Sequence, residues 1–249
     1  MSKFQKGVIT LSIDDGRKDA YALVNEVLNV YKIPATFNIT TAFIGGGNSL
    51  SLEQLKEIHN NPLFEIAAHG HNHKNFDEDI TTGRKLLYDW LNITEDSIGF
   101  ASPGSGMEED FICENSSHLR DLGFLYVRTG FSQCERNADT HKRLSGYEGA
   151  GINEIYYDFP NMCINSVPIL TGRTVESLNK MVDLAASEKA CLTLMFHSVR
   201  KKGEYNPEDL WTYDYDKFVE FIKYLAAKRD SGEIEIMTTK AAYLKGKRF

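Results

Sequence analysis

The chain has 249 residues, a hydrophobic fraction of 42% and a net charge of −7 at pH 7. These values are ordinary for a globular protein, and we expect residues 1–249 to form a single domain. An acidic chain without a basic stripe is a poor candidate for nucleic-acid binding. No apolar run approaches the roughly 20 residues that a membrane span needs. No signal peptide is recognisable, so a cytoplasmic location is the default expectation, with secretion as the alternative if a leader was trimmed.

Strand-like and helix-like segments alternate along the chain. The apolar runs predict strands over residues 8–13, 35–40, 64–68, 98–102, 124–128, 154–157, 190–196 and 233–237. Helical spacing and capping residues predict helices over 18–31, 51–59, 79–91, 108–121, 174–187 and 215–228. This alternation, with nearly continuous apolar strands, predicts an α/β fold in which a parallel sheet is covered by helices.

Two adjacent carboxylates, Asp14 and Asp15, follow the first predicted strand. Neighbouring residues of an extended chain point in opposite directions, so one carboxylate can bind a metal while the other acts on a water molecule. The alternative is a plain helix N-cap pair, because Asp favours that position. The doublet by itself does not decide between these interpretations.

Three of the seven histidines, His69, His71 and His73, lie within five residues after the third predicted strand. Neutral imidazoles combined with a carboxylate are good ligands for zinc and similar metals. A set made of Asp15 and two of these histidines would leave coordination positions open for water and substrate. The alternative is a His-rich surface loop, and we expect one of the three histidines to serve only a structural or supporting role.

Further polar candidates also come at or after the ends of predicted strands. His197 ends a strongly apolar strand and could act as a general acid near the Asp/His cluster, or be a satisfied structural histidine. Arg128 could orient a carboxylate base, bind an anion or form an ordinary surface ion pair. Asp158 could orient His197. The carboxyl ends of strands are where α/β proteins build their sites.

These residues resemble the NodB-homology polysaccharide deacetylases, which are carbohydrate esterase family four, over roughly residues 7 to 245. Residues 12–16 (SIDDG) resemble the family's Thr-Phe-Asp-Asp-Gly motif, and residues 69–73 (HGHNH) match its His-(Ser/Thr)-x-x-His motif at the outer histidines. Residues 100–103 (FASP), which end at Pro103, match part of the third motif. Residues 194–197 (LMFH) match Leu-x-x-His.

The resemblance implies a distorted (β/α) barrel, often with seven parallel strands. It implies Asp14 as general base, His197 as general acid, and Asp15, His69 and His73 as ligands of a divalent metal. Zinc is the first choice for that metal, and cobalt, nickel or manganese are alternatives. The expected reaction removes an N-acetyl or O-acetyl group from an acetylated sugar or polysaccharide. The sequence indicates neither the sugar nor an oligomeric state.

Two departures from the family pattern concern the surroundings of the metal. The third motif usually carries an Arg that holds the base, and Ala101 stands there instead, so we hypothesise that Arg128 supplies this charge from the next strand. The fourth motif, an Asp-rich stretch with Trp, is not recognisable, and Asp158 is only a candidate for it. Two alternatives therefore stay open: a related hydrolase of cyclic imides or ureides, and a carbohydrate-binding protein that has lost catalysis.

Overall fold

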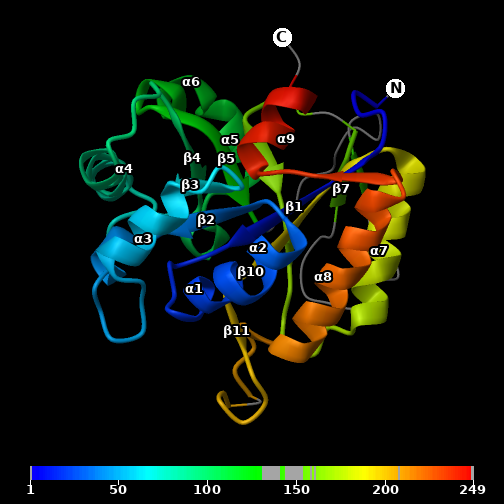
Figure 1. The fold of residues 1–249 in the computed structure, drawn as a ribbon. Helices are drawn as coiled ribbons and strands as arrows, with labels where there is room; N and C mark the ends of the chain where they lie inside the picture. The colour runs from blue at the N-terminus through cyan, green and yellow to red at the C-terminus, as the bar shows by residue number, and fades with distance from the viewer. Residues whose placement is uncertain are drawn as a thin grey trace.

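The computed structural model describes residues 2–130, 141–143, 154–157, 159, 161–206 and 208–247. Its centre is a curled sheet with seven parallel strands in the order β10–β1–β2–β3–β4–β5–β8 (Figure 1). Their bounds are Gly7–Ile13 (β1), Ala35–Ile39 (β2), Phe64–Ala68 (β3), Ile98–Ala101 (β4), Phe124–Thr129 (β5), Cys163–Asn165 (β8) and Cys191–Phe196 (β10). The strands are buried on both faces, which explains their continuous apolar runs.

One short segment joins the two ends of the parallel path. Strand β8 pairs with β5, and β9 (Val167–Pro168) pairs with β10 only two residues further along the chain. The curled sheet therefore meets itself at residues 163–168, as in a distorted barrel. The fold class expected from the sequence, an α/β barrel of about seven parallel strands, is confirmed.

Other strands extend this sheet at its margins. Strand β13 (Ile234–Ile236) adds a parallel pairing to β1. Strand β7 (Glu154–Tyr156) is antiparallel to β10 and to β6 (His141–Arg143), so the strand expected at 154–157 does not continue the parallel sheet. A separate parallel pair joins β11 (Ser198–Arg200) to β12 (Thr212–Asp214). The marginal strands β6, β11 and β12 were not predicted from the sequence. Strands β8 and β9, described above, were not predicted either. Segments of two or three residues carry too little periodicity for such a prediction.

Helices cover the outside of the sheet, with α7 and α8 side by side on one flank and α3 and α4 on another (Figure 1). The bounds are α1 Asp19–Leu23, η1 Val24–Leu28, α2 Asn29–Tyr31, η2 Thr41–Phe43, α3 Leu52–His59, α4 Asp77–Leu91, η3 Pro103–Ser105, α5 Glu109–Glu114, α6 Ser116–Asp121, α7 Val175–Glu188, α8 Tyr215–Asp230 and α9 Thr239–Gly246. None of the helices in the described ranges is long and apolar enough to cross a lipid bilayer.

Most helix predictions hold, including the capping box of Ser51 and Gln54 at the start of α3. The helix predicted over 108–121 is wrong in one respect, because it is interrupted at Asn115 between α5 and α6. Helix α9 was not predicted; its sequence is weakly amphipathic, so its packing against the sheet rather than its own pattern fixes it.

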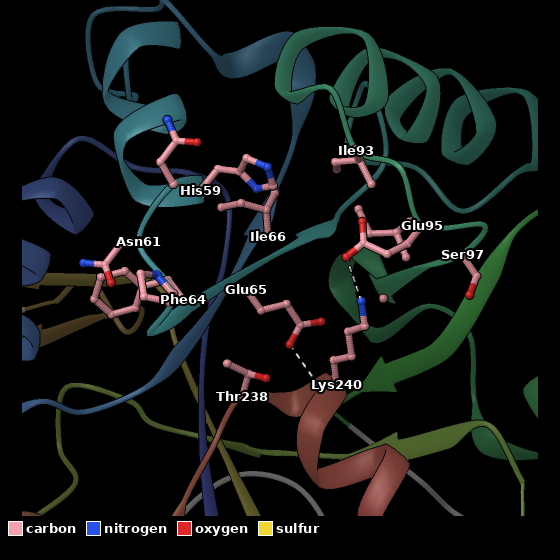
Figure 2. Close-up of a pocket in the computed structure, with 14 residues that line it drawn as sticks. His59, Asn61, Phe64, Glu65, Ile66, Ile93, Glu95, Ser97, Thr238 and Lys240 are labelled. Atoms are coloured by element: carbon pink, nitrogen blue, oxygen red, sulfur yellow. Dashed lines mark hydrogen bonds and ion pairs between the residues drawn. The ribbon is translucent and has the colours of Figure 1, made fainter.

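A buried carboxylate fixes α9 at the amino-terminal end of the parallel strands. Glu65, at the start of β3, accepts hydrogen bonds from Thr36 Oγ1 at 2.8 Å, Tyr126 OH at 2.7 Å and the backbone N–H of Lys240 at 2.8 Å. Burial raises the pKa of Glu65. Glu65 and Lys240 line a cavity of about 330 Å³, and Lys240 also pairs with Glu95 at 3.3 Å. Figure 2 shows these side chains and the dashed Lys240–Glu95 contact. This end of the barrel is distant from the residues that the sequence singled out.

Candidate metal centre and active site

The predicted site residues meet at the opposite, carboxyl end of the strands. Asp14 and Asp15 follow β1, His69 follows β3 and His197 follows β10. In the sheet order β10–β1–β2–β3, the two aspartates lie between His197 on one side and His69 on the other. Parallel pairing brings residues that lie 54 to 183 positions apart in sequence to one edge of the sheet, which explains why the candidates follow different strands.

Asp15, His69 and His73 converge on one point. The carboxylate oxygen Oδ1 of Asp15 lies 3.5 Å from Nε2 of His69 and 3.5 Å from Nε2 of His73. The three potential ligand atoms lie within 4.8 Å of one another. A carboxylate and two imidazoles with open positions beyond them form a donor set suited to a catalytic divalent metal.

The tautomer of His69 fits this role. Its Nδ1 lies 2.8 Å from the carbonyl oxygen of Ala101, an acceptor, so the ring donates through Nδ1 and keeps a lone pair on Nε2. This Nε2 is buried and has no hydrogen-bond partner among the described residues. A buried nitrogen lone pair without a donor is costly unless another group, such as a metal, engages it. The residues present therefore fit a divalent metal.

The protonation states also suit metal binding. Burial raises the pKa of Asp15, but the neighbouring His69 outweighs burial and holds this pKa well below its ordinary value. Burial, with a smaller effect of His69, lowers the pKa of His73. At neutral pH the triad is thus a carboxylate with an imidazole, His73, that remains neutral.

Asp14 is held by Arg128 from the far strand β5. Arg128 NH2 lies 2.6 Å from Oδ1 and 2.5 Å from Oδ2 of Asp14, and both side chains are almost fully buried. Asn38 Nδ2 donates to Asp14 Oδ1 at 2.7 Å. Burial raises the pKa of Asp14, but Arg128 and then the nearby histidines outweigh it, so the pKa lies below its ordinary value. The contact required by the Arg128 hypothesis is therefore present.

His197 faces the same carboxylate. Its Nε2 lies 3.8 Å from Asp14 Oδ2, and 14% of its side chain is exposed. Burial lowers the pKa of His197, with the opposing effects of Asp14 and Asp15 being smaller. Its Nδ1 has no hydrogen-bond partner within the part of the chain that the structure describes. Asp158, the residue expected to orient His197, lies outside the described residues.

Pro103 supports the site rather than lining it. It is buried at the start of η3, and its carbonyl oxygen accepts a hydrogen bond from Asn75 Nδ2 at 2.9 Å. Its neighbours Ser102 and Gly104 line the pocket. His71 does not join the triad, because its Nδ1 lies 2.9 Å from Thr41 Oγ1. This is the supporting role expected for one of the three histidines.

Sequence reasoning missed Arg17, which holds the second oxygen of Asp15. Arg17 Nε lies 3.0 Å and NH2 2.9 Å from Asp15 Oδ2. Because Oδ2 is engaged in this way, Oδ1 is left to face His69 and His73. An arginine two residues after the aspartate was the available signal. Asn38 was also missed, although a polar residue inside an apolar strand signals a partner.

Asp79 was missed as well, and it shapes the loop that carries His73. Its carboxylate accepts backbone N–H groups of His71 at 2.9 Å, Asn72 at 2.9 Å and Lys74 at 3.0 Å. His73 itself has a left-handed φ of 60°. Burial raises the pKa of Asp79, but these backbone donors outweigh burial and lower it. Nothing in the sequence distinguishes Asp79 from an ordinary helix-start acid.

The aspartates and two of the histidines border a cavity of about 250 Å³, lined by Asp14, Asp15, Arg17, His73, Arg128, His197 and Trp211 among others. Cavities of about 690 and 330 Å³ lie elsewhere on the described surface. Size does not decide between them. The cavity of about 250 Å³ combines candidate metal ligands with a buried carboxylate and a histidine that could transfer protons, so it is the candidate active site.

Comparison with known proteins agrees with the motifs. Residues 2–102 match the sequence family described as "Polysaccharide deacetylase". No curated protein sequence matches this chain. Among solved structures, the deacetylase PplD from Streptococcus pyogenes in complex with acetate is 18% identical, with a TM-score of 0.51, and the alignment covers 69% of this chain and 68% of that one.

A family 4 acetyl xylan esterase from Clostridium thermocellum in complex with a cobalt ion is 12% identical, with a TM-score of 0.53, over 95% of this chain and 90% of that one. IcaB from Ammonifex degensii is 26% identical over 47% of this chain and 57% of that one, with a TM-score of 0.41. The NodB-homology polysaccharide deacetylase resemblance is therefore confirmed, in sequence over residues 2–102 and in fold over nearly the whole chain.

Proposed function

We propose that this protein is a metal-dependent deacetylase that hydrolyses the N-acetyl group of an acetylated sugar. The observation that carries the proposal is the convergence of Asp15, His69 and His73 beside an Asp14 carboxylate that Arg128 keeps ionised. Zinc is the metal we expect, with cobalt, nickel and manganese as alternatives. The cobalt ion named for the acetyl xylan esterase agrees with such a donor set in a protein of the same fold.

The residues divide the reaction between them. A bound divalent metal would polarise the acetyl carbonyl and stabilise the negative charge that develops on its oxygen. Asp14 would accept the proton of the attacking water, since its pKa is lowered and it is a carboxylate at neutral pH. His197, in its protonated form, would donate a proton to the departing nitrogen, and its lowered pKa makes that form a stronger acid. The carbon–nitrogen bond then breaks, and the products are acetate and a free amine.

The retained acid and base distinguish this proposal from a binding protein without catalysis. Arg128 is a buried cation, and burying it beside Asp14 is expensive unless the pair is used or tightly matched. Binding of a sugar alone requires neither this pair nor a histidine at 3.8 Å from the carboxylate. The pairing supports an active hydrolase.

The test measures acetate released from N-acetylated and O-acetylated mono- and oligosaccharides by protein stripped with a chelator. Zinc, cobalt, nickel or manganese is then added back singly. We expect stripping to abolish release and one or more of these metals to restore it. Absence of metal-dependent release from every substrate would contradict the proposal.

A pair of histidine variants in one loop provides the control. His73→Ala removes a proposed ligand. We expect the affinity of this variant for the metal to fall at least tenfold. His71→Ala removes an imidazole two residues away that bonds Thr41 instead. Metal affinity should stay within a few-fold of the native value in this control. Equal losses in both variants would point to general disruption of the loop.

A further inference from the structure

Trp211 is an exposed aromatic side chain at the edge of the candidate active site. It lies in the segment that joins β11 to β12, which projects from the sheet beside β11 in Figure 1. Its ring centroid is 4.5 Å from that of His197, at an interplanar angle of 50°. The side chain lines the cavity of about 250 Å³, yet 38% of the residue remains exposed. Leaving indole surface in water forgoes stabilisation, so a ligand that covers this ring would gain free energy.

The backbone around Trp211 is held firmly to the catalytic edge. The Trp211 carbonyl accepts the N–H of Ser198 at 3.2 Å, directly after His197. The Trp211 N–H donates to Asp209 Oδ1 at 3.1 Å, and Thr212 Oγ1 donates to Asp209 Oδ2 at 2.7 Å. Thr171 Oγ1 adds a bond to the Thr212 carbonyl at 2.7 Å. The ring is thus presented as a preformed surface, which lowers the entropic cost of binding a ligand there.

The position of the ring identifies the part of the substrate that it would meet. In the sheet order, Asp14 and Asp15 lie between His197 on the β10 side and His69 on the β3 side. In the proposed reaction, which this inference rests on, the acetyl carbonyl faces the Asp/His/His triad and the departing nitrogen faces His197. The group that keeps the nitrogen after cleavage therefore extends toward Trp211.

We propose that Trp211 is a stacking platform for the pyranose ring that carries the acetylated nitrogen. A pyranose has a flat face of C–H groups and a rim of hydroxyl groups. The large apolar face of an indole matches the C–H face of the pyranose. The polar side chains around the cavity match its rim of hydroxyl groups. Trp211 would thus determine specificity for a sugar and would take no part in proton transfer.

The kinetic test compares Trp211→Ala with Leu210→Ala. Leu210 is the adjacent residue, is 60% exposed and is not part of the cavity lining, so its removal controls for general disturbance of the segment. With tetra-N-acetylchitotetraose and acetylated xylotetraose, we expect Trp211→Ala to raise KM about tenfold with kcat changed less than threefold. With N-acetylethanolamine, which has no sugar ring, Leu210→Ala should match the native protein, and Trp211→Ala should raise KM much less than it does with either oligosaccharide.

A binding test separates this proposal from the proposed activity. The chain has two tryptophans, so Trp90→Phe leaves Trp211 as the sole tryptophan fluorophore. Trp90 is partly buried in α4 and packs against the core. The chelator-treated variant is titrated with the same two oligosaccharides. We expect a saturable change in Trp211 emission, even though no turnover takes place.

The outcomes are distinct. A saturable emission change without any metal-dependent acetate release would support the platform and contradict the deacetylase function. Acetate release combined with flat emission and an unchanged KM in Trp211→Ala would overturn the platform and leave the deacetylase function standing. Flat emission with both oligosaccharides in the absence of turnover also overturns the platform. Parallel losses in Leu210→Ala would assign the effect to the segment and reject a specific role of the ring.

Discussion

Replacing Arg128 by methionine tests the most unusual electrostatic feature of this site. The change removes a guanidinium whose NH2 lies 2.5 and 2.6 Å from the two carboxylate oxygens of Asp14. Among the described side chains, Asn38, at 2.7 Å, is then left as the hydrogen-bond donor to the buried Asp14. Methionine fills much of the space of the arginine, so the loss of charge dominates over the creation of a cavity.

The magnitude follows from the burial of both partners, which are 1% and 2% exposed. Two unit charges about 4 Å apart attract by about 4 kcal/mol at an effective dielectric constant of about 20. Removing one partner of a buried pair costs about 3–5 kcal/mol, because the other charge stays buried alone. We therefore expect Arg128→Met to lower the free energy of unfolding by about 3–5 kcal/mol at pH 7.

The pH dependence of the free energy of unfolding shows whether Arg128 stabilises the ionised form of Asp14. In the native protein the pKa of Asp14 is lowered, so its stabilisation is present above the ordinary value of 3.8 and is lost as the pH falls through the lowered value. Without Arg128, burial raises the pKa of Asp14, and the carboxyl takes up a proton at higher pH. The stability deficit of Arg128→Met should therefore shrink between pH 7 and pH 4.

The assay is urea unfolding of the chelator-treated proteins at pH 7 and pH 4.5, with the double variant Asp14→Asn/Arg128→Met completing a thermodynamic cycle. We expect a coupling energy of about 2–3 kcal/mol at pH 7. Arg128→Lys, which keeps the charge without the planar fork, should retain part of the stability. In kinetics, Arg128→Met should move the acidic limb of kcat/KM upward by about 1–3 pH units. A deficit below about 1 kcal/mol, or one independent of pH, would refute the assigned pairing.

Two further substitutions test the elements that support the site and the fold. Asp79→Asn replaces a carboxylate that accepts hydrogen bonds from three backbone N–H groups. We expect this variant to lower the free energy of unfolding by about 2–3 kcal/mol and the metal affinity by about 10–100-fold. Unchanged metal affinity in a titration with Co²⁺ would reject the role of Asp79 in placing His73. Burial raises the pKa of Glu65, so the stabilisation by its protonated form is full below its ordinary pKa of 4.5 and is lost as the pH rises through the raised value. Glu65→Gln keeps a neutral group of the same shape and should remove this pH dependence of stability. Glu65→Ala leaves three donors unpaired and should lower the free energy of unfolding by about 2–4 kcal/mol. Identical pH profiles of the native protein and Glu65→Gln in urea unfolding would contradict this assignment.

Much of the barrel could be predicted because its signals are local. Apolar runs fixed β1, β2, β3 and β10 to within a residue or two, and the capping box of Ser51 marked the start of α3. The short strands β8, β9, β11 and β12 could not be predicted, since two or three residues carry no measurable periodicity. Helix α9 depends on contacts with Glu65 and Thr36, which lie about 175 and 203 positions away in sequence.

The candidate metal ligands could be picked out from the sequence for the same reason. His69 and His73 share one short loop, and Asp15 follows a strand beside Asp14, so the residue types and spacing alone pointed to a metal. The sequence by itself therefore determined the class of fold and predicted which residues form the candidate metal centre.

Only the tertiary structure decided how that centre is tuned. Arg128 reaches Asp14 across 114 positions of sequence, and the carbonyl of Ala101 sets the tautomer of His69 from another strand. Arg17 and Trp211 acquire their roles only where β1 and the β11–β12 segment meet beside the pocket. Periodicity reports which face of an element is buried, but the partner of a buried charge is set by strand order and register, and these emerge only when distant segments pack together.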